Sequence, residues 1–174
     1  MACVLTIGMS EECDDSLGGI KAGQFLVGQL DTIDGAATVT AGEITALTQV
    51  ADTDFYRYWM KKETANTVTT VTKDPLTGTT VAESVTTAIL QKMTAAKNVE
   101  FKLVAGKPLV LIYQDQNDLW WCVGITNGSE LLSMVAQTGQ TLNEQNGYTL
   151  TFTTREGHLP YTVDATVVAG LSIA

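Results

Sequence analysis

The chain has 174 residues, of which 45% are hydrophobic and 17% are charged, and its net charge is −9. This length and composition predict one folded domain over residues 1–174 and exclude a chain that is disordered as a whole. So acidic a surface argues against a protein that grips nucleic acid through its phosphates, and no apolar run approaches the roughly 20 residues that span a bilayer.

The first half of the chain predicts short strands joined by polar turns. Strands are expected at residues 3–7 and 23–30, with a polar, Gly-rich loop at residues 11–19 between them. A turn then leads into alternation over residues 39–48, and sustained alternation follows from Phe55 to Val71. The start of the chain lacks the basic residues and cleavage site of a signal peptide, which predicts a protein made and kept in a cytoplasm.

A long Thr-rich hairpin at about residues 62–93 is the most unusual feature of the sequence. Its two arms flank a turn at residues 74–78, and each arm is roughly 15 residues long, against the five or six residues of a typical strand. Threonine favours extended backbone yet tolerates water. Because threonine lies on both sides of the hairpin, neither face is hydrophobic enough to cover a core of its own. We therefore expect the far half to project and its exposed edges to pair with identical neighbours, as strands do in a closed barrel. The residues expected to make these inter-subunit contacts are Thr64, Asn66, Val68, Thr70, Thr72, Lys73, Asp74, Pro75, Leu76, Thr77, Gly78, Thr80, Val81, Glu83 and Val85.

One helix is predicted at about residues 94–105. Thr94 can cap its start, and Gly106 followed by Pro108 is a natural stop. Val99, Phe101 and Leu103 are expected to face inward.

The second half of the chain predicts the core sheet. Apolar runs at residues 108–114 and 119–125 flank a polar turn and form a core hairpin. Asn-Gly pairs at residues 127–128 and 146–147 mark further turns, residues 148–153 alternate, and residues 161–168 are expected to close the sheet. The predicted fold class is mainly β, a sandwich or barrel core with one α-helix and a long projecting β-hairpin.

Patterns typical of catalysis or of metal binding do not stand out. The single histidine, His158, is interpreted as a surface turn residue, and no Ser or Cys stands in a nucleophile-elbow setting. The acidic run at residues 11–15 lacks the ligand spacing of a calcium loop. Trp120 and Trp121 would lie on opposite faces of one strand, so at most one is expected in the core, and packing is favoured over a sugar-binding platform. We predict no catalytic, cofactor-binding or metal site, and no enzyme.

The three cysteines, Cys3, Cys13 and Cys122, are an odd number at spacings that match no zinc pattern. A disulfide framework would be far denser. They are interpreted as buried or idle thiols, with a Cys3–Cys13 pair left open.

Several short motifs carry a family resemblance. The run Cys13-Asp14-Asp15-Ser16-Leu17-Gly18-Gly19-Ile20-Lys21 resembles the C-x-D-S-x-G-G-I-K signature of structural proteins encoded by tailed phages of the Bacteroidetes. The likeness continues at residues 55–58, 62–65, 124–128 and 138–139 and ends at residues 146–152, so it spans nearly the whole chain. It departs from the family at Asn117-Asp118, where Asn-Gly is frequent, and at residues 144–147, where Asp-x-Asn-Gly is common.

This resemblance implies a tail-tube-like virion protein. Such proteins share a β-sandwich core, a flanking helix and a long hairpin, and their hexameric rings stack around a channel through which phage DNA passes without specific binding. The implied partners are further copies of the chain and other tail or neck proteins, with no cofactor and no membrane, and the implied location is the virion tail, assembled in the cytoplasm of the bacterial host. The residues expected at ring-to-ring contacts are Glu11, Glu12, Asp14, Asp15, Ser16 and Lys21, with the turn at residues 73–79, and the acids expected near the lumen are Glu63, Glu83 and Glu100.

Other functions stay open beside this one. The same fold serves in single-ring head–tail connectors or neck proteins and in the tube of contractile injection particles. A monomeric β-sandwich ligand-binding module that uses Trp120 or Trp121 is the alternative from a different class.

Overall fold

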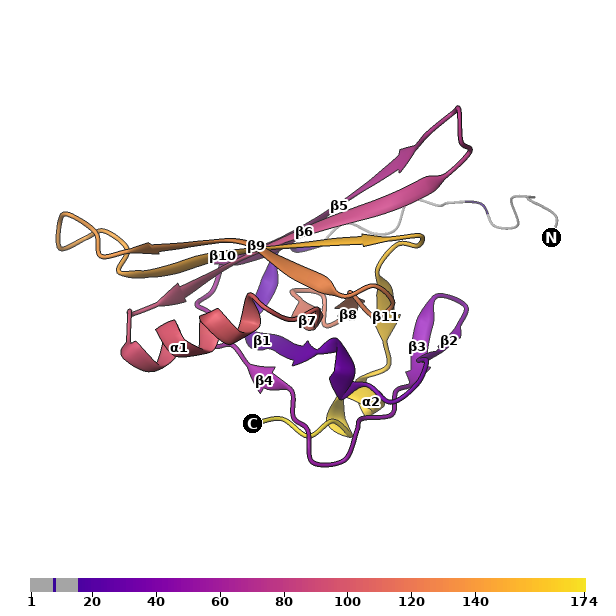
Figure 1. Ribbon diagram of the computed structural model, residues 1–174, viewed down its shortest axis with the longest axis horizontal. Coiled ribbons are helices and arrows are strands. Elements are labelled where there is room, and N and C mark those ends of the chain that lie inside the picture. The colour runs from indigo at the N-terminus through magenta and orange to yellow at the C-terminus, as the bar shows by residue number, and fades with distance from the viewer. Residues whose placement is uncertain (1–7, 9–15) are drawn as a thin grey trace.

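The computed structural model of the protein describes Gly8 and residues 16–174. Within this part of the chain the fold is mainly β, with eleven strands in one mixed sheet that curls into a half-barrel, and two short α-helices (Figure 1). The expected strand at residues 3–7 and most of the expected loop at residues 11–19 lie outside the described residues. The elements are β1 (Ile20–Gln29), a 3-10 turn (Leu30–Thr32), β2 (Thr38–Thr40), β3 (Glu43–Ala46), β4 (Tyr56–Arg57), β5 (Ala65–Lys73), β6 (Thr80–Gln91), α1 (Ala95–Val104), β7 (Leu109–Asp115), β8 (Trp120–Val123), β9 (Ser129–Gln137), β10 (Gly147–Glu156), β11 (Tyr161–Val163) and α2 (Ala165–Ala169).

The centre of the molecule is the apolar strand β7, which pairs with β1 on one side and β8 on the other. Its first five residues are all buried, because this part of the sheet is covered on both faces. Leu109, Leu111 and Tyr113 enter one hydrophobic cluster, whereas Val110 and Ile112 enter a second cluster on the opposite face. The predicted core hairpin of β7 and β8 is thereby confirmed.

The strands β9, β10, β6 and β5, in that order, form an antiparallel region that we call the four-stranded layer. Its inner face covers the first cluster. Tyr148, Leu150 and Phe152 of β10 are fully buried there, which confirms the alternation predicted for residues 148–153. β3, β11 and α2 cover the second cluster, which contains Ile44, Val163 and Val168.

The hairpin of β5 and β6 differs from its prediction. Its strands have nine and twelve residues, not two arms of roughly 15. β6 also pairs with β10 from Ala82 to Gln91, so most of the hairpin belongs to the wall of the domain. Only the segment beyond this pairing, residues 72–81, stands clear of the sheet (Figure 1).

The strand expected from Phe55 to Val71 is not continuous. Tyr56 and Arg57 form β4, the chain then turns, and the strand structure resumes only where β5 begins at Ala65. Glu63 takes up the left-handed backbone conformation in this turn, with φ of 63°, which interrupts any continuous strand.

Helix α1 has the predicted position but a different buried face. The Lys97 amide donates to the Thr94 side chain at 3.3 Å, so Thr94 is the N-cap as expected. Phe101 is buried as predicted, together with Val104. Val99 and Leu103, expected to face inward, are 65% and 59% exposed, because the stripe through Phe101 and Val104 is the one that meets the sheet.

The end of the chain also departs from the expected pattern. The strand expected over residues 161–168 stops at Val163, where Asp164 caps α2 by accepting from the Thr166 amide. A second helix therefore occupies a segment where none was predicted. Among the described residues, no helix reaches the length and apolar character that crossing a membrane requires.

Candidate assembly surface

The outer face of the four-stranded layer is the side turned away from the first hydrophobic cluster. Strand alternation and register place on it Asn66, Val68, Thr70 and Thr72 of β5, Val81, Glu83, Val85, Thr87, Ile89 and Gln91 of β6, Thr149, Thr151, Thr153 and Arg155 of β10, and Glu130, Ser133 and Val135 of β9. Most of these side chains are threonine or small apolar residues. Only Glu83, Glu130 and Arg155 of the set are ionisable, so the face presents mainly hydroxyl and methyl groups.

The three ionisable side chains of this face lie close together. Arg155 donates from Nη2 and Nε to Glu83 Oε1, at 2.9 and 3.0 Å, across the paired strands β10 and β6. Both residues line a hollow of about 380 Å³ together with Glu130, Leu132 and Thr153. The cation of the face is therefore held by a carboxylate.

The inner face of the hairpin explains how so polar a segment joins the wall of the domain. Near the sheet it carries Ala65 and Ala88, but towards the tip it carries pairs of hydroxyl groups. The Oγ1 atoms of Thr67 and Thr86 are 2.8 Å apart, and a pair formed by Thr69 and Ser84 has the same separation. Cross-strand hydroxyl pairs satisfy these groups without requiring an apolar cover.

The two lateral strands of the layer are β5 and β9. Within the described part of the chain, β5 has no strand partner opposite β6, and β9 meets β7 only at the single pair of Ser129 with Leu109. From Glu130 onward, the edge of β9 is therefore unpaired in this part of the molecule. Unpaired edges are ready templates for strand addition.

Both of these edge strands expose large apolar side chains. Val68 and Val71 of β5 are 56% and 51% exposed, and Leu132 and Val135 of β9 are 66% and 52% exposed. Met134 of β9 is also exposed. Exposed apolar residues that gather on unpaired edges are typical of surfaces that another chain covers.

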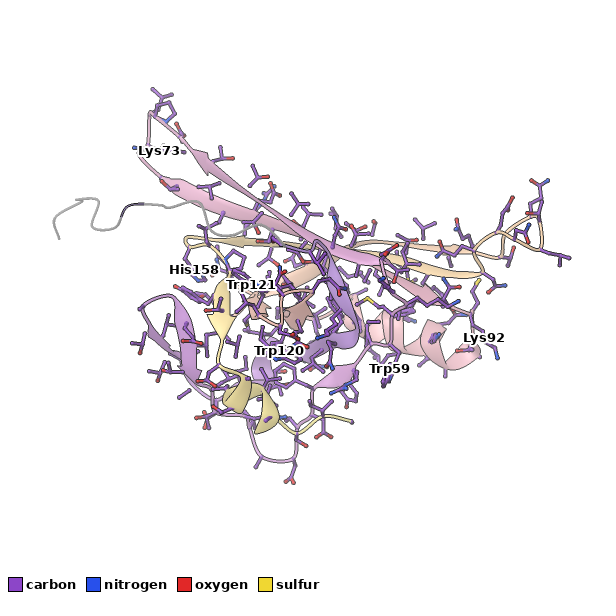
Figure 2. All side chains as sticks on the ribbon, turned by 180° about the vertical axis from the view of Figure 1, so that it is seen from behind. Trp59, Lys73, Lys92, Trp120, Trp121 and His158 are labelled. Carbon is purple, nitrogen blue, oxygen red and sulfur yellow. The ribbon has the colours of Figure 1, made fainter. Side chains whose placement is uncertain are left out.

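The tip of the hairpin is a defined turn. The Asp74 amide donates to the Thr79 carbonyl, the Gly78 amide donates to the Asp74 carbonyl, and the Leu76 amide donates to Asp74 Oδ1. These contacts hold Leu76 almost fully in solvent, at 95% exposure. Figure 2 shows Lys73 at the base of this tip, far from the body of the domain.

Of the residues predicted to make ring-to-ring contacts near the start of the chain, the structure describes Ser16 and Lys21. Ser16 is exposed, and Lys21 in β1 forms an ion pair with Asp118 in the turn between β7 and β8. The adjoining Leu17 is tied to Asn117, whose side chain accepts from the Leu17 amide at 2.9 Å. The remaining members of that set, Glu11, Glu12, Asp14 and Asp15, lie outside the described residues.

The three acids predicted to lie near a lumen are not brought together. Glu83 lies on the outer face of the four-stranded layer. Glu100 lies on α1, on the inner side of the layer, where it raises the pKa of Tyr58 in addition to the larger effect of burial. Glu63 lies in the exposed turn before β5, with its carboxylate 3.6 Å from the Lys62 ammonium.

The two adjacent tryptophans lie on opposite faces of β8, as predicted. Neither is fully buried, but both pack on the core, Trp121 against the first cluster and Trp120 against the second. Figure 2 labels both residues. The Trp121 indole donates to Asp115 Oδ2 at 2.9 Å. Trp121 also lines a hollow of about 490 Å³ with Tyr113 and Asn66.

The other candidate groups have structural surroundings. His158 lies in the turn after β10, as expected, and stacks on Tyr161 at 4.2 Å between ring centroids. Cys122 is a buried free thiol whose pKa is raised by burial, while Cys3 and Cys13 lie outside the described residues. Among the residues that the structure describes, no cluster of three or more His, Cys, Asp or Glu side chains could hold a metal ion.

Sequence reasoning missed β9, which supplies one of the two free edges. Its alternation is broken by a bulge, because Ser133 pairs with Thr151 whereas Leu131 pairs with Phe152, and Leu132 is the extra residue between them. The period of two therefore changes phase inside the strand. The apolar residues within 131–135 are the feature of the sequence that could still have indicated this strand.

No family model, curated protein or solved structure matches the chain. A functional assignment therefore depends on the four-stranded layer, on its two edges without a strand partner in the described part of the chain, and on the short motifs in the sequence.

Proposed function

We propose that the protein is a virion structural protein whose copies join edge to edge into rings, and that stacked rings form a tail tube through which phage DNA passes during ejection. The observation that carries this proposal is the pair of unlike edges, β5 and β9, on opposite sides of one antiparallel layer, both unpaired among the residues that the structure describes. The motif resemblance supplies the class of particle, the number of six copies in a ring and the stacking of rings.

The strand directions favour a ring over a symmetric dimer. β5 and β9 are different strands, so contact between them is a heterologous, head-to-tail contact, which generates rings when the rotation closes. The layer has four strands that alternate in direction. A neighbour related by rotation about an axis along the strands therefore presents β9 antiparallel to β5, and closure leaves no free edge in the layer.

The outer face suits the wall of a channel for DNA. A wall that carries clustered Lys or Arg would retain phosphate groups, whereas hydroxyl and methyl groups let a duplex slide. The cation of this face, Arg155, is paired with Glu83, and the chain as a whole carries a net charge of −9. In this proposal the tube is a passive conduit, and other parts of the particle drive the genome.

The size of the purified protein tests the proposal. Light scattering should give a mass several times the 18.6 kDa of one chain, and negative-stain electron microscopy should show rings or tubes with a central channel. A protein that remains monomeric at high concentration, in the presence of its intact tip and edges, would contradict assembly. Single rings without stacks would favour the connector or neck protein of the same fold.

A monomeric ligand-binding module is the second candidate, and the hollow beside Trp121 favours it. Its aromatic lining, formed by Tyr113 and Trp121, and the neighbouring Asp115 carboxylate are groups that bind sugars or other polar ligands. A glycan-array screen with the wild-type protein and the Trp121→Ala variant separates this function from assembly. Trp121-dependent binding by an 18.6 kDa monomer would support the module.

A further inference from the structure

The hydrogen-bonding pattern of the hairpin shows which groups of β5 face its free edge. In an antiparallel pair, residues that exchange main-chain hydrogen bonds alternate with residues that do not. The Ile89 amide donates to the Thr64 carbonyl and the Asp74 amide donates to the Thr79 carbonyl, both at 2.9 Å and both in the register of the hairpin. Even-numbered residues of β5 are therefore bonded to β6, and odd-numbered residues direct their amides and carbonyls to the free edge.

The same alternation shows which residues of β9 direct their main-chain groups to its free edge. The Lys92 amide donates to the Asn146 carbonyl at 2.7 Å, in the register of β6 with β10, so the even-numbered residues of β10 are bonded to β6. The odd-numbered residues of β10 are consequently bonded to β9, where they pair with Ser133, Val135 and Gln137. The main-chain groups of Met134 and Ala136 therefore point to the free edge.

These two patterns restrict how β5 of one copy can meet β9 of the next. The bonded pairs must join odd-numbered residues of β5 to Met134 and Ala136, and outer-face residues must lie opposite outer-face residues. A register shifted by one residue is excluded, because it would place outer-face residues of one strand opposite inner-face residues of the other. Only registers that differ by two residues remain.

One of these registers matches the side chains of the two edges. It places Asn66, Val68 and Thr70 opposite Gln137, Val135 and Ser133 of the next copy, so amide meets amide, apolar meets apolar and hydroxyl meets hydroxyl. In the same register, Val71 lies opposite Leu132 of the next copy. A shift of two residues would instead place Val68 opposite Gln137 and Thr70 opposite Val135. Matched cross-strand pairs of this kind stabilise a sheet.

We infer that neighbouring copies join β5 to β9 in this register, with Val68 of one copy directly opposite Val135 of the next. The inference rests on the proposed ring and goes beyond it by fixing the residues that meet. Val68 and Val135 are each more than half exposed in the isolated chain, and the joint covers both.

The register makes a covalent test possible. Val68 and Val135 would form a pair that exchanges no hydrogen bonds, and in such pairs the Cα atoms are about 4.5 Å apart. This separation lies inside the range of about 4.4–6.8 Å that a disulfide spans. A Val68→Cys/Val135→Cys variant should therefore form disulfides between copies, in a background where Cys3 and Cys13 are replaced by Ser and the buried Cys122 is kept.

The expected result is a ladder of multiples of 18.6 kDa on a denaturing gel without reductant, which collapses to the monomer when dithiothreitol is added. Each single-cysteine variant should remain monomeric on the same gel, because a head-to-tail contact does not bring like residues together. The matched control is Thr70→Cys/Val135→Cys, which tests the register shifted by two residues and should give no ladder. Val68, Thr70 and Val135 are all exposed, and far-UV circular dichroism checks that each variant is folded.

Two results would overturn the inference and can be told apart. Rings in the microscope without a ladder from the Val68/Val135 variant, or with a ladder from the Thr70/Val135 variant instead, would overturn the register and leave the proposed function standing. A monomer by light scattering for the unsubstituted protein would remove both.

Discussion

The Arg155 guanidinium lies against Glu83 on the outer face of the four-stranded layer, with both Nη2 and Nε within 3.0 Å of one carboxylate oxygen. The two residues are directly opposite in the register of β10 with β6, so the strand pairing itself sets their contact. Both side chains are substantially exposed, and an ion pair of this kind stabilises the fold by less than about 1 kcal/mol. Its main consequence concerns the surface potential, because the carboxylate neutralises the cation of that face.

Replacing Glu83 with Gln should create a weak affinity for DNA. The variant keeps a hydrogen-bond acceptor for Arg155 but removes the compensating charge, so the guanidinium becomes available to phosphate. We expect no binding of a short duplex by the wild-type protein at low salt, and weak binding by Glu83→Gln in fluorescence anisotropy. Each Arg–phosphate contact should add about 0.9 to the slope of log affinity against log salt concentration.

The control for this experiment is Glu130→Gln, which removes one negative charge from the same face without freeing an arginine. It should bind as little DNA as the wild-type protein, and the double variant Glu83→Gln/Arg155→Gln should lose what Glu83→Gln gained. Equal binding by Glu130→Gln would show that total charge, and not the masking of Arg155, keeps DNA off the surface.

The buried hydroxyl pair of Ser129 and Thr154 should contribute measurably to stability. These side chains hydrogen-bond to each other where β9 begins beside β10, and they are 0% and 3% exposed. Thr154→Val leaves the Ser129 hydroxyl buried without its partner, which should lower the free energy of unfolding by about 1–3 kcal/mol. Urea denaturation measures this loss.

A second substitution separates the hydrogen bond from packing. In Ser129→Ala/Thr154→Val both hydroxyls are absent, so part of the lost stability should return. Thr149→Val makes the same chemical change on the outer face of β10 and should alter stability by less than about 0.5 kcal/mol. A loss for Thr149→Val as large as that for Thr154→Val would contradict the role of the buried pair.

Local patterns in the sequence predict the elements whose surroundings are simple. Thr94 marks the start of α1, the apolar run before Tyr113 marks a strand buried on both faces, and alternation marks the inner face of β10. Each of these segments carries one local signal: a helix cap, an apolar run or an alternation of period two. In each segment the burial in the folded protein is the one that this signal predicts. These parts of the fold follow from sequence alone.

The errors arise where the environment depends on distant strands. The far half of the hairpin was expected to project because its side chains are polar and its arms are long. The projecting part is shorter than that, because β10 pairs with β6 and hydroxyl pairs such as Thr67 with Thr86 satisfy the inner face. Val99 and Leu103 were expected inside because they are apolar, yet α1 turns Phe101 and Val104 to the sheet. No local pattern states which face of an element a distant segment will cover.

Acid should loosen the tip of the hairpin. The Leu76 amide and the Thr77 hydroxyl donate to the Asp74 carboxylate and lower its pKa below the ordinary value of 3.8. Because the folded-state pKa is depressed, this stabilisation of the turn is complete above pH 3.8 and is lost as the pH falls through the lower folded value. In an NMR titration, the Leu76 amide should shift with a midpoint below 3.8.

Substitution of Asp74 gives a test at neutral pH. Asp74→Asn retains an oxygen acceptor for the Leu76 amide and should preserve its protection from hydrogen exchange, whereas Asp74→Ala should lose that protection. A titration midpoint at or above 3.8, or equal protection in both variants, would contradict the turn geometry.

Shortening the tip should separate ring formation from stacking. Residues 73–80 can be replaced by Asn-Gly, because Thr72 and Val81 are a hydrogen-bonded pair in the alternation of the hairpin and Asn-Gly closes such a pair with a type I′ turn. Apart from Val81, residues 72–81 are exposed, so the free energy of unfolding should change by less than about 1 kcal/mol. The edge of β5 that faces β9 of the next copy is retained, and rings should still form.

Contacts between rings should be lost in the same variant, since the tip with its exposed Leu76 extends beyond the layer. Electron microscopy should then show single rings in place of tubes. Leu76→Ser in the intact hairpin is the matched control, and shortened or fewer tubes for that variant would assign the contact to the leucine itself. Tubes of normal length from the shortened hairpin would show that other loops hold the rings together.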